Sequence, residues 1–220
     1  MAANFREAAA EIGEEFEDQT GHTAVFSYGS SGQLFAQIVQ GAPFDIFLSA
    51  DSYRVSEVLQ AGEAVTGTRF TYAIGRIALF SLDPSLTTGP QVLRKARFGR
   101  LAIAQPRTAP YGKAAVEAME ALGVLETLAS RIVSGQSVAQ AYQFVHSGNA
   151  DLGFVSLAQV RTSTIGEYWL VPERLHLPIR QDAVLLERGA HSEAARAFLS
   201  FLGSSDATPI LVQYGYGLPQ

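Results

Sequence analysis

Four short segments of the chain combine small residues with serine, asparagine or tyrosine at positions where helices are expected to begin. They are Asn4 and residues 29–32, 109–112 and 136–138. The first turn of a helix has backbone N–H groups without partners and a partial positive charge, and this combination attracts anions. Serine and asparagine add short donors, and glycine lets a ligand approach the backbone closely. These segments therefore indicate a site for an anion.

Cationic side chains are absent from the four segments, although Arg107 and Lys113 lie near one of them. Donors without a cationic partner suit a fully ionised oxyanion, which never has to be protonated. Each segment alone is also what an ordinary N-cap looks like. Their conjunction is more informative, because ligands of open α/β sheets bind beyond the carboxyl ends of the strands, where all four helix starts are expected to meet.

Motifs of nucleotide binding and of nucleophilic catalysis are incomplete. Gly112 and Lys113 are followed by Ala114, and Arg107 stands where a P-loop requires its first glycine. Gln33 occupies the position at which a nucleophile elbow would need glycine. The sequence therefore supports neither a P-loop nor a serine hydrolase.

Metal-ion chemistry and acid–base chemistry have no clustered residues to support them. The histidines are scattered without an i, i+4 pair, so surface or structural roles are expected for His22, His146, His176 and His191. The acidic residues at the end of the first helix are expected to form a solvated face: Glu14, Glu15, Glu17 and Asp18. We expect no enzyme activity, no cofactor and no direct metal-ion ligands.

Composition narrows the class of protein further. The 220 residues are 47% hydrophobic, which is enough for a buried core and excludes an intrinsically disordered chain. A net charge of -5 leaves a nucleic-acid binder without an electrostatic footprint. Cysteine is absent, which excludes disulfides and zinc–thiolate sites. No apolar run reaches the roughly 18 residues needed to span a bilayer, and residues 1–7 lack the pattern of a signal peptide.

Extended and helical segments alternate along the chain, which is typical of α/β architecture. Strands are predicted at 23–28, 44–49, 69–82, 101–104, 131–133 and 151–156 and within 175–187. Helices are predicted at 5–19, from the 29–32 turn as far as Gly41, and at 51–60, 111–122, 137–146, 192–202 and 209–214. Asn4 is expected to be the N-cap of the first helix.

Two long extended stretches, 69–82 and 175–189, bracket the middle of the chain. This placement predicts an inserted domain that is joined to an outer domain by two crossing strands. The outer domain is expected at 1–74 together with 184–220, and the inserted domain at 77–180. Each domain is expected to be a mixed sheet flanked by helices.

One string, GAPFDIFLSAD at 41–51, is especially specific. Further strings are AANF at 2–5, GSSGQL at 29–34, RFTYAIG at 69–75, APYG at 109–112, SV at 137–138, ADLGFV at 150–155 and GYGLP at 215–219. Together they cover nearly the whole chain and resemble the periplasmic molybdate-binding proteins of ABC importers. The resemblance implies a two-domain clamp of the type II solute-binding fold, whose hinge closes the interdomain cleft on a tetrahedral molybdate or tungstate dianion.

The resemblance implies that the ligand contacts fall on Asn4, Ser31, Tyr111 and Val138, with Ala3 as a further candidate. Asn4 and Ser31 would provide side-chain and backbone donors from one domain. Tyr111 and Val138 would contribute mainly backbone N–H groups from the other. Val138 has no polar side chain, so a packing role is an alternative for it, and Tyr111 could equally form a cleft wall. Ala3 stands where relatives have a hydroxyl residue, so one donor is expected to be lost.

The same resemblance implies a monomer in the periplasm that delivers its anion to a membrane permease and does not bind nucleic acid. Members of the family begin with a strand that leads into the Ala-Ala-Asn loop, and this chain starts after that strand, also without a signal peptide. A missing central strand exposes sheet edges on both neighbours. A weakened but recognisable site is therefore expected.

Three alternatives remain open at this point. A binding protein for sulfate or another oxyanion shares every argument except the size of the cleft. An anion-sensing regulatory domain of the same fold would need a helix-turn-helix segment, and none is found in this acidic chain of 220 residues. An enzyme on this fold would need an anchor such as a reactive cysteine, and cysteine is absent.

Overall fold

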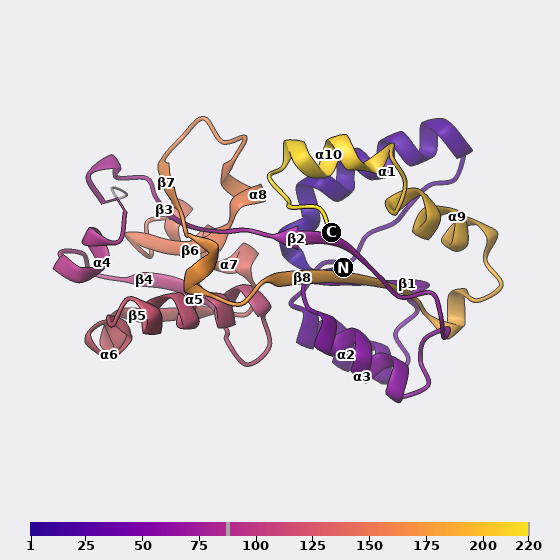
Figure 1. Cartoon of the computed structure of the whole chain (residues 1–220), viewed down its shortest axis with the longest axis horizontal. Helices are drawn as coiled ribbons and strands as arrows, with labels where there is room; N and C mark the ends of the chain where they lie inside the picture. The colour runs from indigo at the N-terminus through magenta and orange to yellow at the C-terminus, as the bar shows by residue number, and fades with distance from the viewer. Residues whose placement is uncertain (87–88, 220) are drawn as a thin grey trace. The chain divides into compact units, whose positions relative to one another are not determined.

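The computed structural model describes residues 1–86 and 89–219. The chain forms two units, the first of Met1–Gly75 with Arg180–Gln220 and the second of Arg76–Ile179 (Figure 1). It passes from the first unit to the second between Gly75 and Arg76, and returns between Ile179 and Arg180. Both units are α/β, so the predicted fold class is confirmed.

The first unit contains a three-stranded sheet with the order β1-β8-β2. Its strands are β1 (Ile46–Ser49), β2 (Phe70–Gly75) and β8 (Ile179–Leu185). β1 and β8 are antiparallel, with Phe47 opposite Val184 and Ser49 opposite Asp182. The helices are a 3-10 turn at Ala3–Phe5, α1 (Arg6–Thr20), α2 (Ser31–Val39), α3 (Ser52–Gln60), a second 3-10 turn at Glu187–Gly189, α9 (Glu193–Leu202) and α10 (Ala207–Gln213).

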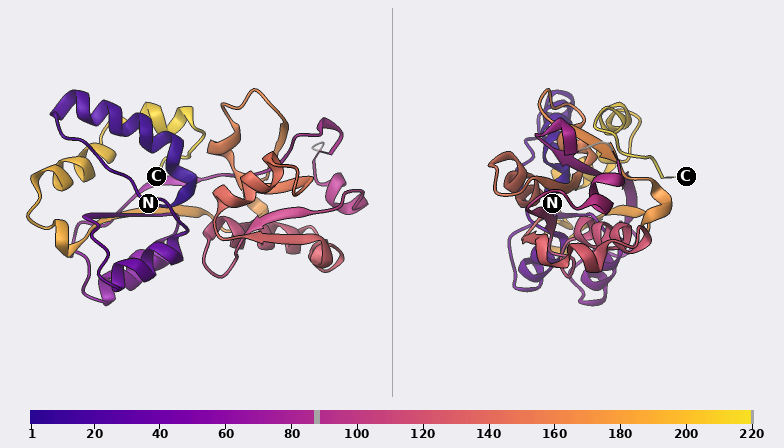
Figure 2. Two further views of the ribbon diagram at one scale, coloured as in Figure 1. Left: turned by 180° about the vertical axis from the view of Figure 1, so that it is seen from behind. Right: turned by 90° about the vertical axis from the view of Figure 1, so that its left-hand side faces the viewer.

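Helices cover both faces of this sheet. Figure 2 shows α2 and α3 on one side, and α1, α9 and α10 on the other. On the first side, Leu34 and Val55 pack against Phe47 and Val184 in one apolar cluster. Side chains alternate between the faces of a strand, so neighbouring residues of β1 and β8 are available to the second side. There the core includes an edge-to-face contact between Phe16 and Phe198, with ring centroids 5.2 Å apart.

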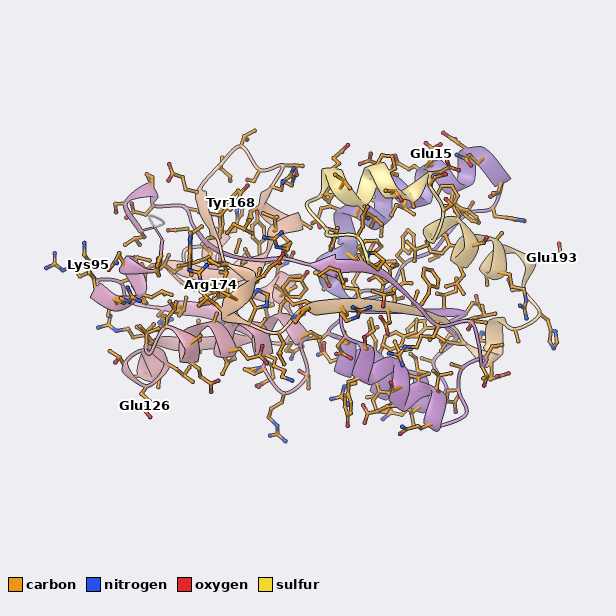
Figure 3. The ribbon with its side chains drawn as sticks, viewed as in Figure 1. Glu15, Lys95, Glu126, Tyr168, Arg174 and Glu193 are labelled. Carbon is orange, nitrogen blue, oxygen red and sulfur yellow. The ribbon has the colours of Figure 1, made fainter. Side chains whose placement is uncertain are left out.

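The acidic residues of α1 form a solvated face, as expected. Glu14, Glu15, Glu17 and Asp18 are all exposed. Glu15 on α1 and Glu193 at the start of α9 point outward from the ribbon (Figure 3). The opposite stripe of α1 is buried, with Ile12 and Phe16 in the core.

The strand predicted at 23–28 is wrong. This segment has no regular structure, and the nearby pairing is limited to an isolated parallel bridge between Ala2 and Gly29. A strand requires a ladder of partners along its length, and among the described residues this segment has partners only near its carboxyl end. Val25 in its middle is 92% exposed. The β-favouring composition of the segment was therefore not sufficient to form a strand.

The second unit contains a five-stranded mixed sheet with the order β5-β4-β6-β3-β7. Its strands are β3 (Ile77–Ser81), β4 (Leu101–Ala104), β5 (Ile132–Gly135), β6 (Leu152–Ser156) and β7 (Glu167–Leu170). Its helices are α4 (Gln91–Lys95), α5 (Pro110–Ala121), α6 (Leu125–Leu128), α7 (Val138–His146) and α8 (Leu157–Val160), and its 3-10 turns are Pro84–Leu86, Ala129–Arg131 and Glu173–Leu175. β4 runs parallel to β5 and β6, whereas β3 is antiparallel to β6 and β7.

The core of the second unit lies on the sheet beneath α7. Ala141 and Val145 of α7 pack in one cluster with Ala102 and Val155. Gly153 permits this close contact, because a Cβ there would lie 2.6 Å from Cγ2 of Val145. α5 packs against β3, β4 and β6. The helices thus hold the parallel strands β4, β5 and β6 from which two of the candidate segments emerge.

Most predicted elements are confirmed within a few residues, but several short ones were not anticipated. β7, α4, α6 and α8 were all missed. The stretch predicted at 69–82 is two strands, because regular pairing stops at Arg76, where the chain enters the second unit. The short elements contain no more than five residues each, so they show too little periodicity to be recognised.

Candidate functional site

In the first unit, the segment around Ala2 and Ala3 lies beside the ends of two other segments, at Gly29 and Leu48. The N–H of Ala2 donates to the carbonyl of Leu48 at 2.9 Å, and the N–H of Ala3 donates to the carbonyl of Gly29 at the same distance. Ala2 therefore lies between the ends of two other segments. The residues that follow these ends include Asn4, Ser31 and Ala50, so the predicted candidates of this unit emerge at one edge.

Asn4 is not the N-cap of α1. It lies inside the 3-10 turn that leads directly into that helix, and the N-cap is Phe5, which makes no side-chain cap. The side chain of Asn4 is instead engaged with distant residues. Its Nδ2 donates to Oε1 of Gln181 at 2.9 Å and to the hydroxyl of Tyr216 at 3.1 Å. The hydroxyl of Tyr216 donates in turn to the backbone carbonyl of Asn4 at 2.7 Å.

A fully buried polar network therefore holds Asn4. Gln181 lies on β8, and its Oε1 also accepts a hydrogen bond from the hydroxyl of Tyr72 on β2 at 3.0 Å. The rings of Tyr72 and Tyr216 both contact Phe5, edge-on, at centroid distances of 4.9 and 5.4 Å. Buried polar groups are costly unless they are hydrogen-bonded, so a network with these contacts fixes the turn.

Ser31 is the first residue of α2 and is fully buried. Its Oγ accepts a hydrogen bond from the N–H of Ala50 at 2.9 Å. A hydroxyl has one proton and two lone pairs, so this contact leaves the Ser31 O–H able to donate. The preceding residue, Ser30, is the N-cap of α2 and forms a capping box with Gln33. These neighbouring serines thus have different roles, because Ser30 caps the N-terminus of α2 and Ser31 bonds to the segment after β1.

Ala3 supplies no donor of its own to this edge. Its side chain is a methyl group, and its N–H is already bonded to the carbonyl of Gly29. The residue is buried, at 6% exposure. Ala3 can therefore line the site, but neither its side chain nor its backbone N–H is available to donate to an anion.

In the second unit, α5 and α7 begin at the same edge of the sheet. β4 and β5 are parallel neighbours, with Ala104 opposite Gly135, and the N–H of Gln105 donates to the carbonyl of Gly135 at 2.7 Å. The carboxyl ends of parallel strands lie at one edge, and each strand here is followed by a helix. Tyr111 is the second residue of α5 and Val138 the first of α7, and both are buried.

The start of α5 is packed directly onto the end of β4. A Cβ on Gly112 would lie 2.1 Å from the carbonyl oxygen of Ala104, so only glycine fits there. Pro110 occupies the first position of the helix, which suits its fixed φ and its lack of an N–H. The start of α7 has a conventional cap, in which Ser137 accepts a hydrogen bond from the N–H of Gln140. Both helix starts are therefore determined by neighbours close in the sequence.

Charged groups near these edges are few. Lys113 is largely exposed and is 3.9 Å from Glu117 in an ion pair. Asp51 follows Ala50 and is the N-cap of α3, where its Oδ1 accepts a hydrogen bond from the N–H of Arg54 at 2.6 Å. Burial raises the pKa of Asp51, and the hydrogen bond from Arg54 partly opposes this shift. Within residues 1–86 and 89–219, no group of three or more His, Asp or Glu residues could hold a metal ion.

Sequence reasoning did not identify Gln181 or Tyr216, the two residues whose side chains bond to Asn4. One usable signal was present, since Gln181 and Asp182 lie next to the apolar run Ala183–Leu185 within one strand, and both are buried. Asp182 is 2% exposed and binds Arg69 and Thr71. A polar pair inside a buried strand indicates that polar partners must be nearby.

Among the described residues, no helix is long and apolar enough to cross a membrane.

Comparison with known proteins agrees with this architecture. The sequence model of the bacterial extracellular solute-binding proteins matches residues 1–217. The molybdate-binding protein ModA of Rhodobacter capsulatus is 48% identical over 216 residues, which cover 98% of this chain and 86% of that protein. ModA of Azotobacter vinelandii is 45% identical over 222 residues, covering 99% of this chain and 88% of that protein.

A solved structure extends the likeness to three dimensions. The periplasmic molybdate-binding protein of Azotobacter vinelandii superposes with a TM-score of 0.95 at 40% sequence identity, covering 100% of this chain and 98% of that one. A family match over almost the whole chain and relatives near half identity point to the same group of proteins. The chain therefore belongs to the family of bacterial extracellular solute-binding proteins, among the molybdate-binding ModA proteins.

Proposed function

We propose that this protein is the substrate-binding component of an ABC importer and that it captures molybdate as a tetrahedral dianion. Membership of the ModA group supports this proposal. The observation that carries it is the grouping of donor-bearing segments at one edge in each unit. In the first unit these segments contain Asn4 and Ser31, and in the second they contain Tyr111 and Val138.

The proposed ligand residues are Asn4, Ser31, Tyr111 and Val138, with Ala3 packed beside the first two. Ser31 would donate its hydroxyl proton, which its contact with Ala50 leaves available. Hydrogen bonds to a charged acceptor contribute about 1.5–3 kcal/mol each. Several such bonds together can offset the cost of removing a dianion from water. Helix starts add a favourable partial charge without introducing a cation.

Donor chemistry also supports selection among anions. Molybdate and sulfate have the same shape and charge, so only the larger size of molybdate can separate them. A site fitted to the larger tetrahedron leaves the hydrogen bonds of sulfate too long. Hydrogen phosphate has a proton that requires an acceptor, and a site of donors leaves it unpaired. Tungstate closely resembles molybdate in shape and charge, and we propose that it binds as well.

The remaining parts of the proposal follow from the same role. The protein would act as a periplasmic monomer, pass its anion to a membrane permease, and catalyse no reaction. No cofactor is required for such a role, because the anion itself is the cargo. A binding protein needs only reversible hydrogen bonds to its ligand, and the proposed residues provide N–H and O–H groups.

Thermal unfolding with separate additions of molybdate, tungstate, sulfate and phosphate tests the proposal. A ligand at about one hundred times its Kd stabilises the folded state by about 2.7 kcal/mol, which raises the Tm by roughly 5–10 °C for a chain of this size. We expect this shift with molybdate and tungstate, and a much smaller one with sulfate or phosphate. An equal shift with sulfate would make the protein a general oxyanion binder. The absence of any shift would overturn the proposal.

A further inference from the structure

The hydroxyl of Tyr216 determines which way the Asn4 amide points. That hydroxyl has one proton, and it donates this proton to the backbone carbonyl of Asn4 at 2.7 Å. Its oxygen can therefore only accept from the Asn4 side chain, which lies 3.1 Å away. The atom facing Tyr216 must then be the donor Nδ2 and not the carbonyl oxygen Oδ1. This pattern of hydrogen bonds fixes which end of the Asn4 amide is the nitrogen and which is the oxygen.

The orientation of the Gln181 amide is determined in the same way. Asn4 Nδ2 lies 2.9 Å from the Gln181 side chain, so the atom of Gln181 that faces it must be the acceptor Oε1. The hydroxyl of Tyr72 then donates to that oxygen, at 3.0 Å. An amide NH2 group has two protons, and both are directed to partners within the network: one to Gln181 and one to Tyr216.

The backbone N–H of Asn4 differs from its side-chain donors and from the backbone N–H groups on either side. The N–H of Ala3 donates to Gly29, and the N–H of Phe5 donates to Ala2. Within residues 1–86 and 89–219, the N–H of Asn4 between them has no acceptor at hydrogen-bond distance. The side-chain donors of this residue are thus occupied, whereas its backbone donor is available at the beginning of a helical stretch.

We propose that the Asn4 side chain is an anchor that orients the backbone N–H of Asn4 toward the anion, and that Tyr216 and Gln181 are the positioning residues of this anchor. The inference rests on the proposed function and refines it. Side-chain and backbone donors were expected from Asn4 and Ser31 together, and this inference assigns only the backbone donor to Asn4. It also makes a residue near the carboxyl end of the chain, Tyr216, a determinant of anion affinity.

Two tyrosine variants separate positioning from general stability. Tyr216→Phe removes both hydrogen bonds between that hydroxyl and Asn4. Tyr72→Phe removes a buried hydroxyl of the same network that contacts Gln181 and makes no contact with Asn4 in this set of bonds. Both rings keep their packing on Phe5. Tyr72→Phe is therefore the matched control, in which buried polar contact is lost while the Asn4 bonds persist.

Calorimetric titration with molybdate, well below the denaturation midpoint of each variant, gives the first measurement. We expect Tyr216→Phe to raise the Kd about tenfold, as loss of one well-oriented hydrogen bond to a charged group would, and Tyr72→Phe to raise it less than about twofold. Equal increases in Kd would overturn the positioning role while leaving the proposed function intact. If the wild-type chain does not bind molybdate, the proposed function itself fails and this inference fails with it.

Nuclear magnetic resonance of the wild-type chain gives a second readout, which general destabilisation would not move. On addition of molybdate, the backbone N–H resonance of Asn4 should shift strongly. The side-chain NH2 resonances should shift little, and their protons should exchange slowly with solvent both with and without the anion. A larger shift of the side-chain NH2 than of the backbone N–H would overturn the proposal.

Discussion

The two units hold their candidate donors in different ways. In the first, Asn4 is fixed by partners that lie 177 and 212 positions away in the sequence, on β8 and near the carboxyl end. In the second, Tyr111 and Val138 begin helices that directly follow two parallel strands, and their turns are set by close neighbours such as Gly112 and Ser137. The comparison shows that equivalent chemistry can rest on long-range side-chain contacts or on local backbone geometry.

The local geometry of the second unit should be the easiest to break. Gly112→Ala places a Cβ 2.1 Å from the carbonyl oxygen of Ala104, a backbone atom that cannot move without displacing β4. We expect the free energy of unfolding to fall by about 3 kcal/mol or more, because overpacking against a backbone atom has no inexpensive relaxation. Molybdate binding should become undetectable. Urea denaturation and calorimetric titration measure the two effects.

Gly29→Ala is the matched control in the first unit. Its Cβ would approach Leu34 no closer than 3.4 Å, which is close to ordinary contact, and Gly29 does not have a positive φ. We expect a change in stability of less than about 1 kcal/mol. Equal losses in the two variants would show that local packing is not what distinguishes the units.

Long-range contacts should dominate in the first unit. Asn4→Ala removes two buried side-chain hydrogen bonds and leaves polar atoms of Gln181 and Tyr216 to find other partners. The expected cost is about 2–3 kcal/mol of unfolding free energy. Ser137→Ala removes an N-cap in the second unit, and its expected cost is about 1 kcal/mol. Urea denaturation of both variants tests the comparison, which would be wrong if the cap proved the costlier loss.

This contrast also explains which features the sequence could predict. The starts of α5 and α7 follow from short patterns: proline after Ala109 and serine before Val138, each shortly after a strand. Asn4 carried an equally clear local pattern for an N-cap, and the prediction was wrong because its amide bonds to Gln181 and Tyr216 instead. The propensity of a residue to cap a helix depends on its sequence neighbours, so it cannot reveal partners that are distant in the sequence. The strand predicted at 23–28 was wrong for a related reason, because β-favouring composition does not provide the neighbouring strand with which hydrogen bonds must form.

Neighbouring serines allow stability and binding to be separated within α2. Ser31→Ala removes the hydroxyl that accepts from the N–H of Ala50, and we expect a loss of about 1 kcal/mol in stability with about a tenfold increase in the Kd for molybdate. Ser30→Ala removes the N-cap of the same helix at a similar cost of about 1 kcal/mol. Its Kd should change less than about threefold, since a hydroxyl that caps the helix is not a proposed ligand. Similar Kd values for the two variants would remove Ser31 from the proposed ligand set.

The smallest expected effect concerns the charge of Asp51, next to Ala50. Burial is the main cause that raises the pKa of this carboxyl above its ordinary value of 3.8, so the native state binds more protons than the unfolded state between that value and the raised pKa. The free energy of unfolding should therefore fall as pH rises through this interval. At neutral pH the carboxyl is ionised, and the full cost of burying its charge is present.

Asp51→Asn keeps an oxygen that can accept from the N–H of Arg54 and removes the charge. We expect a gain of a few tenths of a kcal/mol at neutral pH and a shallower dependence of stability on pH from about pH 4 upward. Removal of a negative charge close to Ser31 should also tighten molybdate binding, by about twofold. Asp45→Asn, at a carboxylate that is 53% exposed, is the control and should change neither quantity. If Asp51→Asn instead weakens binding, the Asp51 carboxylate holds this edge in place more than its charge repels the anion. The first unit would then depend on the Asp51 carboxylate as well as on the contacts of Asn4 with Gln181 and Tyr216.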